Sequence, residues 1–217
     1  MSIENQILPT HETPAQTIGG TAPAGTSKRL LDLVLGGVLL AGFLPIGLLV
    51  ALLIKLDSKG PVLFRQQRIG FNGRPFQIVK FRTMHVLEDG EAVIQVTRDD
   101  PRVTRIGHLL RQTGFDELPQ LLNVLAGDMS LVGPRPHAVL HDDYYGARIA
   151  NYAHRRRVRP GITGWAQVKG ARGATPTLAD MQQRADLDAW YVDHCSLALD
   201  LRILLLTPLE IILPARE

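Results

Sequence analysis

The sequence predicts an α/β protein that is mainly α-helical and that meets a membrane through one apolar segment. Three observations support this prediction. Residues 33–54 carry no charge. Residues 60–84 alternate apolar and polar side chains around Asn72-Gly73. Apolar residues recur at helical spacing through much of the remainder, between glycine and proline breaks. With 217 residues, 45% of them hydrophobic, the chain can form one globular domain besides the apolar segment.

The charge and cysteine content narrow the function classes. A formal net charge of +3 is small for this length and argues against a dedicated nucleic-acid-binding protein. The single cysteine, Cys195, excludes a disulfide within the chain and suits a reducing compartment. We expect this thiol to be a packing residue, because no histidine is arranged to activate it.

Residues 1–27 predict a disordered N-terminal tail. They are rich in threonine, alanine, glycine and proline and carry few charges. They also lack the basic start and apolar centre of a secretory signal. We therefore expect three regions: this tail, a membrane segment over residues 28–59, and a globular domain over residues 60–217.

The apolar run within residues 28–59 is long enough to cross about 30 Å of hydrocarbon as a helix. Pro45 lies at its centre, where it removes a helical hydrogen bond. Basic residues flank both ends, so the positive-inside rule gives no orientation, because both ends look cytoplasmic. A helix that bends at Pro45 and leaves by the face it entered satisfies both observations. A straight span with a proline kink is the alternative, and the residues alone do not decide between them.

The sequence of the globular domain predicts a β-hairpin followed by helices. The hairpin covers residues 60–84 and turns at Asn72-Gly73. We expect a helix entered near Pro101, a second that starts at Asp116 and stops at Gly127, and two more over residues 137–153 and 178–194. Residues 155–176 read as a basic loop, and residues 197–214 as an apolar stretch against the membrane surface or the core.

Two adjacent carboxylates, Asp116 and Glu117, stand directly before an apolar run. Helix capping explains one of them, since Asp116 is a good N-cap residue and both charges gain from the helix dipole. Capping explains the pair less well, because neighbouring like charges destabilise each other unless a cation lies between them. Carboxylate and phosphate oxygens suit Mg²⁺, and no His/Cys cluster suggests zinc. The alternative is therefore a metal-assisted phosphate-transfer site.

Basic residues form the context of this pair. Lys80 and Arg82 lie in "KFRTM", and Arg135 stands between Pro134 and Pro136 as a preorganised fork for phosphate. Four further arginines accompany glycines that allow close backbone approach: Arg155, Arg156, Arg157 and Arg159. For that run, a solvated or lipid-facing surface competes with a catalytic role. No P-loop motif occurs.

Several long motifs in fixed order resemble one family. They are "GPVLFRQQRIG", "KFRTM", "DDPRVTRIGHLLR", "FDELPQLLNVLAGDMSLVGPRP", "RPGITGWAQV" and "LDAWYVDHCSLALDLRILLLT". Together with the basic-flanked apolar segment, they resemble the bacterial sugar transferases, the monotopic polyprenyl-phosphate phosphoglycosyl transferases. The likeness runs over residues 28–208.

The resemblance implies an activity and a set of site residues. Asp116 would attack the β-phosphate of a UDP-sugar, releasing UMP, and polyprenyl (undecaprenyl) phosphate would then accept the phosphosugar. Glu117 would complete the pair and help Asp116 to hold Mg²⁺, or Mn²⁺ in its place. Arg135 would bind phosphate or nucleotide, while Lys80, Arg82 and Asp188 are further substrate-binding candidates.

The resemblance also implies a location. It favours a re-entrant helix with both ends on the cytoplasmic face of the bacterial inner membrane, and amphipathic helices at the interface. Expected partners are membrane lipid, other polysaccharide-assembly glycosyltransferases and a second copy of the chain, with no nucleic acid. Glucose and galactose both remain open as the sugar. The rival from another class is a non-enzymatic membrane scaffold, which would need neither adjacent acids nor a Pro-Arg-Pro element.

Overall fold

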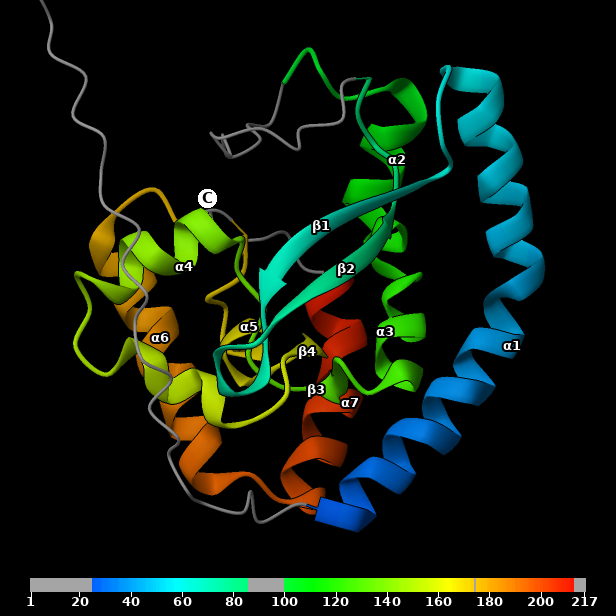
Figure 1. Cartoon of the computed structure of the whole chain (residues 1–217). Helices are drawn as coiled ribbons and strands as arrows, with labels where there is room; N and C mark the ends of the chain where they lie inside the picture. The colour runs from blue at the N-terminus through cyan, green and yellow to red at the C-terminus, as the bar shows by residue number, and fades with distance from the viewer. Residues whose placement is uncertain (1–24, 86–99, 174, 213–217) are drawn as a thin grey trace, which may run out of the picture.

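The computed structural model describes residues 25–85, 100–173 and 175–212 (Figure 1). The predicted tail over residues 1–24 lies outside this part, and Gly25 to Ser27 form the first turn of a helix. The helices are α1 (Gly25–Asp57), α2 (Arg105–Thr113), α3 (Gln120–Ala126), α4 (Val139–Gly146), α5 (Trp165–Val168), α6 (Leu178–His194) and α7 (Leu197–Ile212). The strands are β1 (Leu63–Ile69), β2 (Pro75–Phe81), β3 (Ser130–Val132) and β4 (Gly161–Thr163), and the 3₁₀ turns are η1 (Phe71–Gly73), η2 (Phe115–Glu117) and η3 (Tyr152–Arg157). The mainly helical class with a short hairpin is confirmed.

Helix α1 runs along one side of the molecule and is long and apolar enough to cross a membrane. Pro45 lies inside it, and Figure 1 shows the helix axis changing direction about midway. Its outward side exposes large apolar side chains, namely Leu30, Leu33, Val34, Val38, Leu44, Ile46, Leu48, Leu49, Leu52 and Leu56. Such a continuous apolar surface is typical of a membrane contact.

The inward side of α1 packs on the globular domain along its whole length. Its first half lies against the main core, which includes Val124 of α3 and Ile203 of α7. Its second half buries Val50 and Ile54 with Phe81 of β2 and with α2. Because α2 and α3 flank η2, α1 lies next to both helices that hold the acidic pair.

Polar contacts hold both ends of α1 to this domain. Near the first end, Lys28 Nζ lies 2.6 Å from Asp200 Oδ2 of α7, and Arg29 donates to two carbonyls at the end of α3, at 2.6 and 2.8 Å. At the second end, Asp57 Oδ2 accepts from the backbone nitrogen of Ile106 at 3.1 Å. Both ends of the membrane segment therefore contact the same globular domain.

The hairpin prediction is confirmed. Strands β1 and β2 pair antiparallel from Leu63↔Phe81 to Ile69↔Pro75. The turn uses left-handed backbone at Asn72 and Gly73, with φ of 53° and 76°, which these two residue types tolerate well. Asn123 of α3 bonds the backbone of β2, accepting from the Val79 nitrogen and donating to the Gln77 carbonyl. This side chain fixes the hairpin on α3.

Two predicted helices are confirmed. Helix α6 covers the predicted residues 178–194, and Thr177 with Asp180 forms a capping box at its start. Helix α2 begins at Arg105, after Pro101, because the Thr104 side chain accepts from the Gly107 nitrogen and sets the first turn.

Two other predictions are corrected. The single helix expected over residues 137–153 is divided into α4 and η3, because Asn151 takes left-handed backbone with φ of 61°. The basic loop contains β4, which pairs parallel with β3, followed by α5. A Cβ atom built on Gly161 would lie 2.1 Å from the nitrogen of Gly133, so only glycine allows these two segments to approach.

Candidate active site

The acidic pair lies in η2, between α2 and α3. Gly114 ends α2 with φ of 72° and turns the chain into η2. Neither η2 nor α3 has a side chain bonded to its first backbone nitrogens, and α3 begins after Pro119 rather than at Asp116. The capping interpretation of Asp116 is therefore wrong, while the predicted stop of α3 at Gly127, with φ of 94°, is confirmed.

Glu117 is held by two cations from distant parts of the chain. Lys80 Nζ of β2 lies 2.7 Å from Oε1, and Arg135 donates to both oxygens, Nη1 to Oε2 at 2.9 Å and Nη2 to Oε1 at 2.5 Å. Burial opposes the charge of Glu117, but Arg135 and Lys80 together outweigh it and hold the pKa of Glu117 well below its usual value. Glu117 is thus an ionised carboxylate whose charge is balanced by Lys80 and Arg135.

Asp116 occupies a different environment from its neighbour. Only 9% of this residue is exposed, and no side chain or backbone group in the described part donates a hydrogen bond to its carboxylate. Burial raises the pKa of Asp116, although Lys80, Arg111 and Arg135 attract its charge. An ionised carboxylate without hydrogen-bonded partners is free to react or to bind a cation.

Two further arginines belong to this site. Arg68 of β1 donates to the Pro136 carbonyl at 3.2 Å, and burial together with Arg135 lowers its pKa to about 10. Arg111 at the end of α2 lies 3.3 Å from Thr83 Oγ1 and attracts the charge of Asp116. Neither was among the predicted site residues. Their sequence signals were weak: Arg68 is one arginine in the predicted hairpin, and Arg111 stands five residues before Asp116.

Two predicted site residues lie apart from the acidic pair. The guanidinium of Arg82 bonds the Ser58 carbonyl at 2.8 Å, its hydroxyl at 2.9 Å, and the Lys59 carbonyl, and so fixes the connection between α1 and β1. Asp188 of α6, 2% exposed, accepts from Arg155 at 2.8 and 3.1 Å. The structure brings together Lys80, Arg135 and the acids, and separates Arg82 and Asp188 from them.

The donor set of the acidic pair fits a hard divalent cation. The described residues contain no group of three or more His, Cys, Asp or Glu side chains that could hold a metal alone. Mg²⁺ commonly binds one or two carboxylates plus substrate phosphates, and Asp116 offers a free carboxylate. A carboxylate has about four acceptor positions, of which Lys80 and Arg135 use three on Glu117, so one remains.

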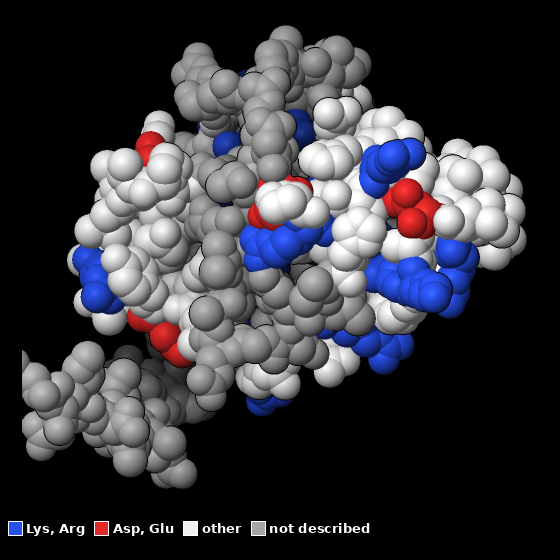
Figure 2. Space-filling model, turned by 90° about the horizontal axis from the view of Figure 1, so that it is seen from above, with Lys and Arg blue, Asp and Glu red and all other residues white. Residues whose placement is uncertain are grey.

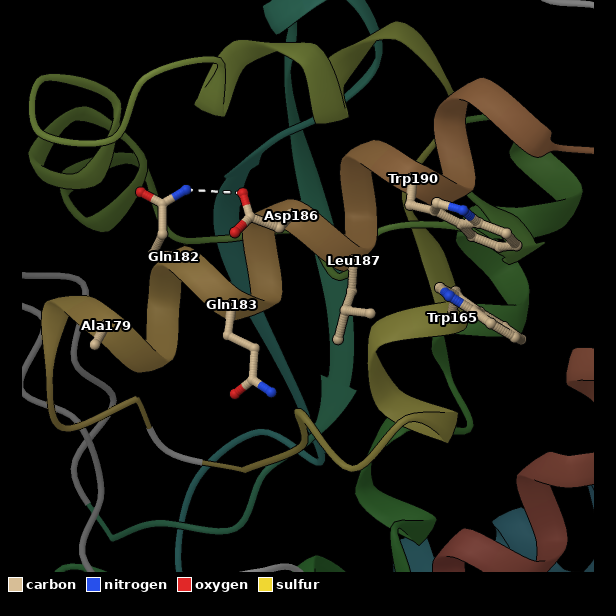
Figure 3. Close-up of a pocket in the computed structure, with 7 residues that line it drawn as sticks. All are labelled: Trp165, Ala179, Gln182, Gln183, Asp186, Leu187 and Trp190. Atoms are coloured by element: carbon tan, nitrogen blue, oxygen red, sulfur yellow. Dashed lines mark hydrogen bonds between the residues drawn. The ribbon is translucent and has the colours of Figure 1, made fainter.

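A groove of about 680 Å³ lies elsewhere, on the outward side of α6 (Figure 3). Trp165 and Trp190 stack at one end of it, with ring centroids 4.8 Å apart. Gln182, Gln183 and Asp186 also line it, whereas Asp188 faces Arg155 from the opposite side of the helix. The acidic pair does not line this groove, so it is separate from the candidate active site.

The two acids should respond oppositely to neutralisation. Burial raises the pKa of Asp116 on folding, so its charge lowers stability above the usual carboxyl pKa. Asp116→Asn should therefore keep or raise the melting temperature at pH 7.5. The pKa of Glu117 falls on folding, so its charge stabilises the fold above its unfolded pKa. Glu117→Gln should lose about 1–3 kcal/mol, because Lys80 and Arg135 lose their partner.

Thermal unfolding in detergent with a chelator, at pH 7.5 and pH 4, measures both effects. The difference in melting temperature between each variant and wild type should shrink at pH 4, because the wild-type carboxylates at positions 116 and 117 then bind protons in the folded or the unfolded state. Changes of equal size and the same sign in the two variants would contradict the different environments of Asp116 and Glu117.

Comparisons with known proteins agree with the motif resemblance. The family model described as "Bacterial sugar transferase" matches residues 24–214. The "UDP-glucose:undecaprenyl-phosphate glucose-1-phosphate transferase" of Caulobacter vibrioides is 59% identical over 180 residues, which are 83% of this chain and 67% of that protein. The protein of the same name from Escherichia coli K12 is 45% identical over 201 residues, 93% of this chain and 42% of that protein. The "Exopolysaccharide production protein PSS" of Rhizobium leguminosarum bv. phaseoli is 46% identical over 181 residues, 82% of this chain and 90% of that protein.

The extent of these matches is sufficient to assign the family. The chain spans about two thirds of the Caulobacter relative and less than half of the Escherichia coli relative, and it covers most of the Rhizobium protein. The matched region includes the membrane segment, the hairpin and the acidic pair. The chain belongs to the bacterial sugar transferase family.

Proposed function

We propose that this chain transfers glucose 1-phosphate from UDP-glucose to undecaprenyl phosphate, giving undecaprenyl-diphosphate-glucose and UMP. The names of the Caulobacter and Escherichia coli relatives support the substrates. The name of the Rhizobium relative supports a role in exopolysaccharide synthesis. One observation supports the proposal for this chain most directly. The Asp116 carboxylate accepts no hydrogen bond from the described residues although Lys80, Arg111 and Arg135 attract its charge. Glu117 beside it is bonded to Lys80 and Arg135, which balance its charge.

The first step uses Asp116 as the nucleophile. A carboxylate oxygen of Asp116 attacks the β-phosphorus of UDP-glucose, and the bond from that phosphorus to the bridging oxygen breaks. UMP leaves with the bridging oxygen, and glucose phosphate stays on Asp116 as an acyl phosphate. Lys80, Arg111 and Arg135, which already attract the charge of Asp116, neutralise the diphosphate oxygens as charge moves to UMP.

The second step returns the enzyme to its starting state. A phosphate oxygen of undecaprenyl phosphate attacks the phosphorus of the acyl phosphate, and the bond to the Asp116 oxygen breaks. The Asp116 carboxylate is regenerated, and the lipid carries a diphosphate linked to glucose. Glu117 keeps Lys80 and Arg135 in place through both steps, because it bonds both of them.

We propose that Asp116 and Glu117 hold Mg²⁺, with Mn²⁺ as a substitute. The free carboxylate of Asp116, the remaining acceptor position of Glu117 and substrate phosphate oxygens make a ligand set of the kind Mg²⁺ prefers. When bound, the ion would neutralise charge on the transferred phosphoryl group.

We also propose that α1 is re-entrant and that the domain lies on the cytoplasmic face of the inner membrane. Polar contacts from Lys28 and Asp57, near opposite ends of α1, reach the same globular domain. A straight span would carry one end across the bilayer, away from its partners. Figure 2, seen from above, shows several separate groups of Lys and Arg side chains on the described surface, with fewer acidic ones. Such a surface suits the cytoplasmic side.

Mass spectrometry of the intact protein tests the nucleophile. After exposure to UDP-glucose without lipid acceptor, wild type should gain one glucose phosphate on Asp116 and release UMP. Asp116→Asn should fold and gain none, because the amide lacks the nucleophilic charge. A panel with UDP-galactose in place of UDP-glucose identifies the preferred sugar.

The controls separate the metal from the nucleophile. With EDTA, wild type should form no adduct until Mg²⁺ or Mn²⁺ is restored. Adduct formation at full yield in excess chelator would remove the metal from the mechanism. An adduct of the same mass on Asp116→Asn would show that another residue is the nucleophile.

Cysteine labelling tests the topology. Ser27 and Lys59 are exposed and lie at the two ends of α1. Single cysteines at these positions, in a Cys195→Ser background, should both resist a membrane-impermeant thiol reagent added to intact cells, and both should react after the inner membrane is opened. Labelling of one position but not the other in intact cells would establish a straight span.

A further inference from the structure

Arg155 of η3 lies directly behind the Pro134-Arg135-Pro136 segment. It is 5% exposed, and its guanidinium donates to the Arg135 carbonyl at 2.5 Å and to His137 Nδ1 at 2.9 Å. Its Nε and Nη2 also donate to Asp188 Oδ2 at 3.1 and 2.8 Å. One buried guanidinium therefore joins α6, η3 and the segment that carries Arg135.

Asp188 serves Arg155 alone among the described side chains. It is 2% exposed, and both of the hydrogen bonds that its carboxylate accepts come from Arg155. Burial opposes the charge of Arg155, but Asp188, Tyr152 and Asp142 together outweigh it and raise the pKa of Arg155 above its usual value. Burial raises the pKa of Asp188, although Arg155 and Arg184 attract its charge. The other donors of the guanidinium point to the backbone of residue 135, to His137 and to the Tyr152 hydroxyl.

The bond from Arg155 restrains the backbone that carries the Arg135 side chain. Proline at position 134 has a fixed φ, and proline at position 136 restricts the backbone of the residue before it. With its carbonyl also held by Arg155, Arg135 has little backbone freedom left. Its fork meets the two oxygens of Glu117 at 2.5 and 2.9 Å on the other side.

We infer that Arg155, held by Asp188, is a positioning residue that sets the Arg135–Glu117 geometry from behind and does not contact substrate. This inference rests on the proposed function, in which Arg135 acts on the diphosphate. It assigns Asp188, a predicted substrate-binding residue, the role of holding Arg155. The alternative is that the pair serves stability alone.

A paired substitution separates these two roles. Removing one member of a buried ion pair leaves an unpaired charge, whereas replacing both members by apolar residues of similar volume is often neutral for stability. Arg155→Met with Asp188→Leu should therefore melt close to wild type. Its turnover in UMP release should fall about 100-fold, because a misplacement of about 1 Å costs that much. The KM for UDP-glucose should change far less than kcat.

The matched control is the neighbouring ion pair of the same 3₁₀ turn. Arg156 bonds Asp142 of α4, which is also 2% exposed, and neither is bonded to the Arg135 segment. Arg156→Met with Asp142→Leu should keep kcat within about threefold of wild type, because neither side chain is bonded to the Arg135 segment. An equal loss of kcat in this control, or full kcat in the Arg155/Asp188 variant, would overturn the inference.

A second variant covers a failure of the paired substitution to fold. Arg155→Lys keeps the charge beside Asp188, but one ammonium cannot reproduce the planar fork that reaches Asp188, the Arg135 carbonyl, His137 and Tyr152. Its kcat, measured well below the melting temperature, should fall about tenfold. Its melting temperature should also fall, because the hydrogen bonds that it loses are buried. Wild-type kcat in Arg155→Lys would refute the inference. Absence of UMP release by wild type would instead refute the proposed function.

Discussion

The carboxylate of Glu117 is the contact on which the site depends. It joins three segments that lie far apart in the chain, because Lys80 comes from β2, Glu117 from η2 and Arg135 from the connection after β3. Together they leave Glu117 neutralised and Asp116 unbonded. Two adjacent acids of similar chemistry thereby occupy different environments, one bonded to two cations and the other without a hydrogen-bond donor among the described residues.

The remaining structure keeps this contact next to the apolar helix α1. Helix α1 packs on α2 and α3, which enclose η2, so the apolar surface and the acidic pair belong to one continuous set of elements. Asn123 on α3 holds the backbone of β2, which carries Lys80. Behind the site, Arg155 holds the carbonyl of Arg135. A lipid-borne acceptor and a soluble nucleotide sugar could meet at such a place.

Local sequence signals predicted the elements that depend on local physics. Asn72-Gly73 marked the hairpin turn, and residues 178–194 showed helical spacing, so both elements were predicted correctly. Contacts between distant residues were missed. Asp32 interrupts the apolar start of α1, yet it is 2% exposed and accepts from Ser130 Oγ and the Leu131 nitrogen, both at 2.9 Å. No sequence signal near Asp32 predicts these bonds. In the same way, no signal near Arg155 predicts its bond to the Arg135 carbonyl. The acidic pair and the roles expected of its two members came from the motif resemblance, while the ion pairs of Glu117 with Lys80 and Arg135 required the folded positions of these residues.

The most direct test of this account is the time course of UMP release from UDP-glucose without lipid acceptor. A covalent intermediate on Asp116 separates the reaction into two steps, so the account predicts a rapid burst of one UMP per active enzyme followed by near-arrest. Addition of undecaprenyl phosphate should then restore steady release. UMP release that occurs only when the acceptor is present, with no burst at any enzyme concentration, would show direct transfer between the two substrates and would contradict the central role of Asp116.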